Sequence, residues 1–239
     1  MAPSAVVDNA VSFRRPGLGL LALEAPRAVA ELGAFGAALP LLRLAPRGYG
    51  HPVVVLPGFM ASDRSTRPLR WFLRDRGYHV HGWRLGANLG PTDHIIEGLD
   101  ARLTRLREVH GGHKLSLIGW SLGGIYAREI ARANPDGIRQ VITLGSPFRL
   151  TDGDGSHASG REPPPLRVPS TAIYSRTDGI AAGESCHDGH GELRECVEVI
   201  GSHCGLGHHP AVLLVIADRL AQPDGAWRPF SLRRLLARR

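Results

Sequence analysis

The sequence is poor in cysteine, and this limits where the protein is expected to work. It has only three cysteines among 239 residues: Cys186, Cys196 and Cys204. An odd and low number is not the pattern of a disulfide-stapled secreted domain, although one bridge between Cys186 and Cys196 stays open. The composition therefore favours a reducing compartment, and we expect a cytoplasmic protein.

Long apolar runs are also missing. No stretch approaches the roughly 18 consecutive apolar residues of a membrane-spanning helix. Arg14 and Arg15 precede a leucine-rich stretch that resembles a signal peptide, but Glu24 and Pro26 interrupt it and no clear cleavage site follows. We therefore expect neither a signal peptide nor a membrane-spanning segment.

Lysine is almost absent: Lys114 is the only one, so arginine supplies nearly all of the positive charge behind the net +7. The arginines are spread along the chain, as in proteins from GC-rich genomes, and no aromatic-basic motif of the common nucleic-acid readers is present. We expect no nucleic-acid partner. The tail 228–239 differs, because its leucines and arginines suit a weak contact with an anionic membrane surface as well as packing on the body.

From residue 50 onward, strand patterns and helix patterns alternate. Strands are predicted at 51–58, 78–85, 114–121, 138–147, 170–178 and 197–203, and helices at 65–77, 93–111, 124–136 and 210–222. This alternation is typical of βαβ units around a parallel sheet. We therefore predict an α/β fold: a single domain with a mostly parallel sheet of about six strands, helices on both faces and little or no cap domain.

Three segments of the predicted fold allow more specific predictions. In the helix 93–111, the apolar spacing predicts that Ile96, Leu99, Leu103 and Leu106 share one buried face. Residues 1–49 are rich in Ala and Leu and are predicted to form one or two helices packed on the main domain, 50–239. The polar segment 149–169 is predicted to be a surface loop that is too short for a cap.

One serine stands out at a junction between strand and helix. The motif Gly119-Trp120-Ser121-Leu122-Gly123 follows an apolar strand and precedes a helical pattern. Gly-x-Ser-x-Gly in this context is a nucleophile elbow, in which the glycines allow a sharp turn that strains the serine backbone and exposes its hydroxyl. The carboxyl end of a parallel strand is also where such sheets bind ligands. Ser121 is therefore the predicted nucleophile, and a helix-capping serine is the alternative.

A serine hydroxyl needs an adjacent base and an acid that orients this base. The chain order that goes with such an elbow is serine, acid and histidine, with the last two just after later strands. Asp178 and His203 occupy these positions. The competing acids, which lie in polar loop sequence, are Asp152, Asp154 and Asp188, and the competing bases are His208 and His209.

Catalysis by this route also needs two N–H groups that bind the developing oxyanion. The first should be the backbone N–H of Leu122, directly after the nucleophile, and the second should come from the loop after the strand 51–58. Phe59 is the predicted second donor, with Met60 as the other choice. Further residues beside the catalytic loops that would suit a substrate pocket, or equally the core, are Met60, Trp120, Phe148 and Ile180.

With these residues in place, the chain resembles the α/β-hydrolase superfamily over roughly residues 50–222, in particular its minimal lipase-like and esterase-like members. The resemblance rests on "LPGF", "GWSLGG", "LGSPF", "SRTDGI" and "GSHCGL". It implies hydrolysis of carboxylic esters through an acyl-enzyme on Ser121, with Asp178 as acid, His203 as base and no cofactor or metal. Pro57 departs from the pattern, since many members have histidine there.

Other functions stay open at this point. An acyltransferase would form the same acyl-enzyme and pass the acyl group to an alcohol, amine or thiol. Cysteine and histidine are dense in 186–196 and 202–209, as in zinc sites, although the spacing matches no standard zinc finger. The basic tail would also suit a membrane-surface lipid-binding protein.

Overall fold

The fold is a six-stranded sheet covered by helices, seen here in a computed structural model that describes residues 16–149 and 164–237. All pairings between the six strands are parallel, and the order across the sheet is β2-β1-β3-β4-β5-β6. The strands are β1 (Pro52–Leu56), β2 (His79–Gly82), β3 (Leu115–Trp120), β4 (Ile138–Leu144), β5 (Ser170–Ser175) and β6 (Arg194–Val199). The predicted six-stranded sheet is confirmed.

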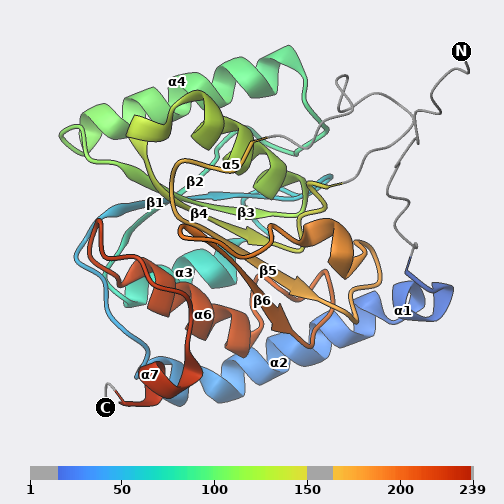
Figure 1. Cartoon of the computed structure of the whole chain (residues 1–239). Helices are drawn as coiled ribbons and strands as arrows, with labels where there is room; N and C mark the ends of the chain where they lie inside the picture. The colour runs from blue at the N-terminus through green and yellow to red at the C-terminus, as the bar shows by residue number, and fades with distance from the viewer. Residues whose placement is uncertain (1–15, 150–163, 238–239) are drawn as a thin grey trace, which may run out of the picture.

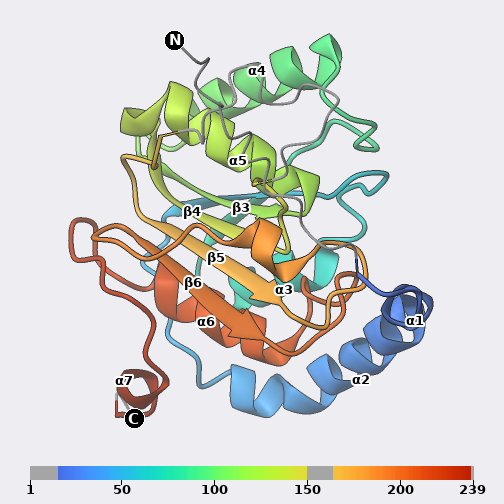
Figure 2. The ribbon, with the colours of Figure 1, turned by 45° about the vertical axis from the view of Figure 1, so that its right-hand side comes forward.

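Helices cover both faces of this sheet. On one face lie α4 (Asp93–Val109) and α5 (Leu122–Ala133), and on the other lie α2 (Glu24–Leu42), α3 (Arg67–Asp75) and α6 (Pro210–Leu220), as Figures 1 and 2 show. Strand β1, which lies between β2 and β3, contributes to the core on both faces: Val53 and Val55 belong to the α3/α6 side, and Val54 and Leu56 to the α4/α5 side. A strand buried on both faces reads as a continuous apolar run, and this is the pattern of "PVVVL".

The sequence prediction for α4 needs one correction. Its buried residues are Ile95, Leu99, Leu103 and Leu106, whereas Ile96 is 55% exposed. The steps 95 to 99 to 103 keep one side of the helix against the sheet, and Ile96 then falls about 100° around the axis. Two adjacent isoleucines at the helix start fit the periodicity almost equally well, so the sequence alone favoured the wrong one.

The N-terminal part of the described chain forms two helices, α1 (Leu18–Ala22) and α2. α2 continues through Gly33, Gly36 and Pro40, which the sequence presents as interruptions. Glu24 and Leu42 are the buried residues of α2, and its apolar contact with the body comes from its second half, where Phe35, Ala38 and Leu42 pack on the core. No helix in the described ranges is long and apolar enough to cross a membrane.

The structure also shows the state of the cysteines and the position of the described part of the tail. All three cysteines are free, so the Cys186–Cys196 bridge is not formed. The tail ends in α7 (Leu232–Ala237), where Leu235 is buried and Leu232 is exposed. Contact of 228–239 with a membrane stays a prediction. Most of the segment 149–169, which was predicted to be a surface loop, lies outside the described residues.

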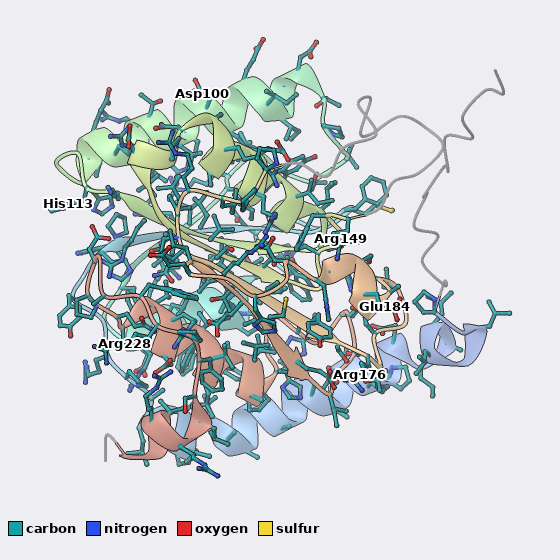
Figure 3. The ribbon with its side chains drawn as sticks, viewed as in Figure 1. Asp100, His113, Arg149, Arg176, Glu184 and Arg228 are labelled. Atoms are coloured by element: carbon teal, nitrogen blue, oxygen red, sulfur yellow. The ribbon has the colours of Figure 1, made fainter. Side chains whose placement is uncertain are left out.

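Because all the strands are parallel, their amino ends lie at one edge of the sheet and their carboxyl ends lie at the opposite edge. Arg149, Arg176 and Glu184 come from segments that follow β4 and β5, and they lie together at one edge, whereas His113, which precedes β3, lies at the opposite edge (Figure 3). The chain also leaves β1 for β2 on one side and then returns to β3 on the other. The crevice between the carboxyl ends of β1 and β3 is where open parallel sheets bind ligands.

Candidate active site

Ser121 sits in a strained turn between β3 and α5. Its backbone has φ 52° and ψ −122°, a conformation that non-glycine residues rarely adopt. The flanking glycines make the turn possible. A Cβ on Gly119 would lie 2.3 Å from the carbonyl oxygen of Gly123, and a Cβ on Gly123 would lie 2.3 Å from the carbonyl oxygen of Leu56. A strained serine between two glycines at the end of a strand is the backbone geometry expected for the predicted nucleophile elbow, whose catalytic role stays a prediction.

The helix-capping alternative for Ser121 does not hold. Ser121 is the N-cap residue of α5, but its side chain makes no capping hydrogen bond. Its backbone N–H donates to the carbonyl oxygen of Leu144 at 2.8 Å, which fixes the turn to the end of β4. On the other side, a Cβ on Gly58 would lie 3.1 Å from the Ser121 Cβ. Among residues 16–149 and 164–237, the hydroxyl has no hydrogen-bond partner, and it lies near the ends of β1, β3 and β4.

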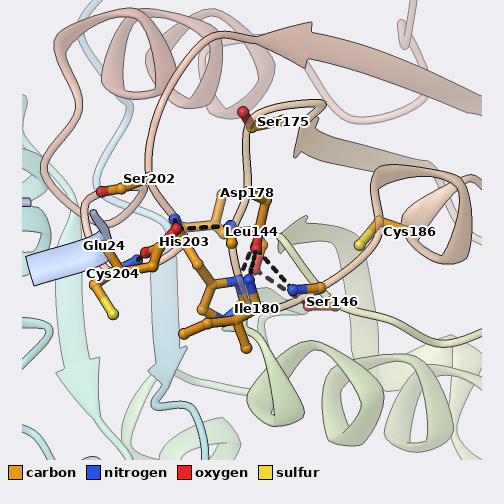
Figure 4. A network of polar contacts seen from close by, with 12 residues as sticks. Glu24, Leu144, Ser146, Ser175, Asp178, Ile180, Cys186, Ser202, His203 and Cys204 are labelled. Atoms are coloured by element: carbon orange, nitrogen blue, oxygen red, sulfur yellow. Dashed lines mark hydrogen bonds and ion pairs between the residues drawn. The ribbon is translucent and has the colours of Figure 1, made fainter. Parts of the chain in front are cut away.

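Asp178 and His203 form a buried pair. His203 Nδ1 and Asp178 Oδ2 are 2.7 Å apart, and both residues are at most 5% exposed (Figure 4). The other carboxylate oxygen, Oδ1, accepts hydrogen bonds from the N–H groups of Ile180 at 2.8 Å and Ala181 at 2.7 Å. An ionised carboxylate can only accept, so the shared proton belongs to Nδ1, and Nε2 is left free to accept a proton.

Two further contacts bring this pair to the Ser121 turn. Trp120, directly before the serine, donates from its indole Nε1 to the carbonyl oxygen of His203 at 3.0 Å. Gly145 follows Leu144 at the end of β4, and a Cβ there would lie 3.0 Å from His203 Nδ1 and 3.1 Å from Asp178 Oδ2. The Asp178–His203 pair thus lies beside the residue before Ser121 and beside the end of β4, at the same edge of the sheet as the serine.

Gly145 offers a test of this packing. Its φ is +53°, so Gly145→Ala strains the backbone and also places a methyl group against the Asp178–His203 pair. Gly111→Ala is the matched control, because Gly111 has φ +63° and nothing within 4 Å of the added carbon. We expect both variants to lose about 1–2 kcal/mol of stability from the left-handed conformation.

On the ester hydrolysis that the sequence predicts, only Gly145→Ala should lower the rate. A displacement of catalytic groups by about 1 Å can cost up to about 10²-fold in rate, so we expect a loss of at least about tenfold in kcat. The measurement is kcat for a p-nitrophenyl ester, corrected for the folded fraction by thermal unfolding. Equal kcat values in the two glycine variants would show that Gly145 does not control the pair.

The backbone N–H groups predicted to bind the oxyanion differ in whether they already donate to another acceptor. Leu122 is the first residue of α5, so its N–H has no acceptor within the helix. The Met60 N–H donates to the carbonyl oxygen of Asn88 at 2.7 Å, whereas the Phe59 N–H has no acceptor among the described residues. Phe59 therefore stays the better predicted partner of Leu122, and Met60 is the weaker one.

Asn88 holds the loop that carries Phe59, and the sequence did not point to it. Its side chain is fully buried, and its Nδ2 donates to the carbonyl oxygen of Pro57 at 2.8 Å. Its backbone N–H donates to the Ala61 carbonyl oxygen at 2.8 Å and its carbonyl accepts from Met60. The segment "GANLGP" signals only a turn after β2, so the link to the 57–61 loop needed the structure.

Two of the four tentative pocket residues belong to the core. Trp120 is buried, bonded to His203 and packed on Gly207, and Phe148 is buried beneath the guanidinium of Arg128, 3.9 Å from the ring centre. Both side chains thus fit the core alternative, and contact of either with a substrate stays a prediction. Met60 and Ile180 are 73% and 48% exposed, and Phe59 is 59% exposed, so these three side chains lie on the surface next to the site.

The competing acids and bases have other partners. Asp188 forms a two-pronged ion pair with Arg128 at 2.6 and 2.7 Å. His208 donates from Nε2 to the carbonyl oxygen of Ala28, and His209 caps α6 by accepting from the Ala211 N–H. Asp152 and Asp154 lie outside the described residues. Within the described ranges, no three Cys, His, Asp or Glu side chains are placed to hold a metal ion.

Solved structures with a similar arrangement of strands and helices identify the fold of this chain. Mouse alpha/beta hydrolase domain-containing protein 10 matches with a TM-score of 0.53 and 13% identity, over 73% of this chain and 90% of that one. The chain has the α/β-hydrolase fold. No protein-family model matches the sequence. The fold predicted from the strand-helix alternation and the elbow motif is confirmed.

Other similar proteins with this fold are lipases. A structure described as LipS and LipT, two metagenome-derived lipolytic enzymes, has a TM-score of 0.55 and 18% identity, over 73% of this chain and 93% of that one. Aspergillus fumigatus lipase B has a TM-score of 0.59 and 15% identity, over 74% of this chain and 53% of that one.

One curated relative is similar in sequence over a short stretch. The biotin biosynthesis bifunctional protein BioHC of Teredinibacter turnerae is 32% identical over 72 residues, which are 30% of this chain. The match spans only 12% of the length of that relative. A segment of this size does not carry over the activity of the whole bifunctional protein.

Proposed function

We propose that the protein is a serine hydrolase that cleaves carboxylic esters through an acyl-enzyme on Ser121. The observation that carries this proposal is the Asp178–His203 pair, buried at the same sheet edge as a serine in the elbow conformation. A serine nucleophile, a histidine base and an acid that orients the base are the three parts that such chemistry requires.

In the proposed reaction, His203 Nε2 takes the Ser121 proton as the hydroxyl attacks the ester carbonyl. Asp178 holds the ring by its Nδ1–H and stabilises the charged imidazolium. The N–H groups of Phe59 and Leu122 bind the oxyanion, and each such donor is worth roughly 2.7–4 kcal/mol in the transition state. His203 then protonates the leaving alcohol, and water repeats these steps on the acyl-enzyme.

The surroundings of the site favour esters with an apolar acyl group. Phe59, Met60 and Ile180 are exposed next to the proposed oxyanion and acid positions. Apolar surface that gathers around a site often binds an apolar ligand. The similarity in fold to lipases points in the same direction, although it concerns those proteins and not this chain.

A panel of p-nitrophenyl esters of rising acyl length tests the proposal. We expect saturable hydrolysis and a single phosphonate adduct on the Ser121 peptide after treatment with a fluorophosphonate probe, as measured by mass spectrometry. Adding a primary alcohol separates hydrolysis from acyl transfer, because a transferase would form mainly the new ester. If no ester is cleaved and no serine is labelled, the proposed function is wrong.

A further inference from the structure

The first residue of α2 reaches the two loops that carry the acid and the base. Glu24 is only 4% exposed, and its carboxylate accepts three backbone hydrogen bonds. Oε1 accepts from the Gly179 N–H at 2.7 Å and from the His203 N–H at 3.0 Å, and Oε2 accepts from the Cys204 N–H at 2.9 Å. One carboxylate therefore joins the residue after Asp178 to His203 itself (Figure 4).

The same side of α2 makes further polar contacts with these loops. Arg27 donates to the carbonyl oxygen and the hydroxyl of Thr177, at 2.6 and 2.8 Å. Glu31 accepts from the N–H and the hydroxyl of Ser202, at 2.7 and 2.5 Å. Residues 24, 27 and 31 are three and four apart, so they lie on one face of the helix. Each contacts a residue next to Asp178 or His203.

A buried carboxylate is costly unless its oxygens are satisfied. Burial by itself raises the pKa of Glu24, but the three backbone N–H groups and the charge of His203 lower it more, so the net pKa is below the usual value. The N-terminal end of α2 adds a favourable partial positive charge. Since none of the apolar side chains in the first two turns of α2 is buried, we infer that these polar contacts decide where those turns lie.

We propose that Glu24 is a positioning residue of the active site, which fixes the Asp178 loop and the His203 loop to each other and places a second negative charge beside the base. The inference rests on the proposed ester-hydrolase function. Asp178 controls the imidazole through its side chain, and Glu24 controls the same residue through its backbone. The N-terminal helix is thus part of the catalytic machinery and not only a cover of the main domain.

The test compares Glu24→Gln with Glu195→Gln. Glu195 is a matched control: it is 3% exposed, and its carboxylate accepts from Thr171 and Arg219, both at 2.9 Å, and from the Phe230 N–H at 2.5 Å. It lies near the start of β6, at the sheet edge opposite to the site. Both substitutions replace one acceptor oxygen by an amide group that cannot accept, so both should lower the unfolding temperature.

We expect Glu24→Gln to lower kcat for a p-nitrophenyl ester by at least about tenfold with little change in KM, because misplaced catalytic groups slow the chemical step more than binding. Glu195→Gln should leave kcat per folded molecule unchanged. Glu24→Asp, which keeps the charge on a shorter side chain, should recover part of the loss. If Glu24→Gln and Glu195→Gln lose stability and kcat in parallel, the positioning role is wrong.

The pH profile gives a readout that general destabilisation would not move. The charged groups around the His203 loop are Asp178, Glu24 and Glu31, with Arg27 on Thr177. Removing the Glu24 charge disfavours the protonated imidazole, so the acid limb of kcat/KM should move to lower pH. An unmoved limb in Glu24→Gln would contradict the electrostatic part of the proposal.

The reactivity of the Cys204 thiol measures the effect of the Glu24 charge without any enzyme assay. Burial raises the pKa of the Cys204 thiol to about 11, and the charge of Glu24 and a hydrogen bond to it act in the same direction. Glu24→Gln should therefore speed alkylation of Cys204 by iodoacetamide at pH 8.5, because the thiolate is the reactive form. Faster alkylation with unchanged kcat would overturn the positioning role alone. An inactive wild type with the expected change at Cys204 would instead overturn the proposed ester hydrolysis.

Discussion

Ser121→Ala is expected to lower kcat for ester hydrolysis by about 10⁵–10⁶-fold, the loss seen when a serine nucleophile is removed from such a machinery. The Ser121 hydroxyl has no hydrogen-bond partner among the described residues, and alanine tolerates the φ of 52° no worse than serine does. The unfolding temperature should therefore change little. Kinetics with a short-chain p-nitrophenyl ester and a thermal melt measure both quantities.

Ser116→Ala is the control for this experiment. Ser116 lies on the same strand, β3, and its buried hydroxyl has no partner among the described residues, so the substitution removes an equivalent group away from the site. Ser116→Ala should keep full activity. An alanine variant of Ser121 that retains more than a few per cent of the wild-type rate would mean that another group is the nucleophile.

Asp178→Asn should lower kcat by about 10⁴-fold with a small change in KM. In the wild type, Oδ1 accepts from two backbone N–H groups and Oδ2 faces His203 Nδ1. The asparagine oxygen will take the place of Oδ1, because two donors point at it, so the amide NH2 must face the ring. Nδ1 then has to accept, and the ring proton moves to Nε2, where it blocks proton transfer from Ser121.

Asp188→Asn separates this effect from the loss of a buried charge. Asp188 pairs with Arg128, and both side chains are at most 7% exposed. Breaking a buried pair on one side typically costs about 3–5 kcal/mol of stability. We expect Asp188→Asn to melt at a lower temperature with unchanged kcat per folded molecule. A comparable fall in kcat for both asparagine variants would argue against Asp178 as the acid.

The sequence predicted those site residues whose positions follow from the order of the strands and helices. The elbow at Ser121 follows from local chemistry, since two glycines and a strand-helix junction leave few other conformations. Asp178 and His203 were placed by their position after later strands, and the structure brings them into contact. These inferences need only the order of elements and the rule that parallel strands share a carboxyl edge.

The residues that sequence reasoning missed or misjudged depend on distant contacts. Glu24 lies 155 residues from Gly179, and nothing around it distinguishes it from a charge that interrupts an apolar stretch. Trp120 and Phe148 are large side chains next to the predicted catalytic loops; the sequence left both pocket and core open for them, and only the structure shows that both are buried. Such contacts depend on the tertiary structure, which the local sequence pattern does not predict.

The docking of α2 also bears on the order in which the protein becomes active during synthesis. The helix is synthesised before its partners, because Thr177, Gly179 and residues 202–204 follow their contacts on α2 by 150 to 180 residues. Contacts between such distant segments form late, because the intervening chain must be ordered first. The growing chain would therefore carry the Ser121 turn for some time before the Asp178 and His203 loops are joined to α2, so the proposed hydrolysis would have to wait until residues 202–204 have been made.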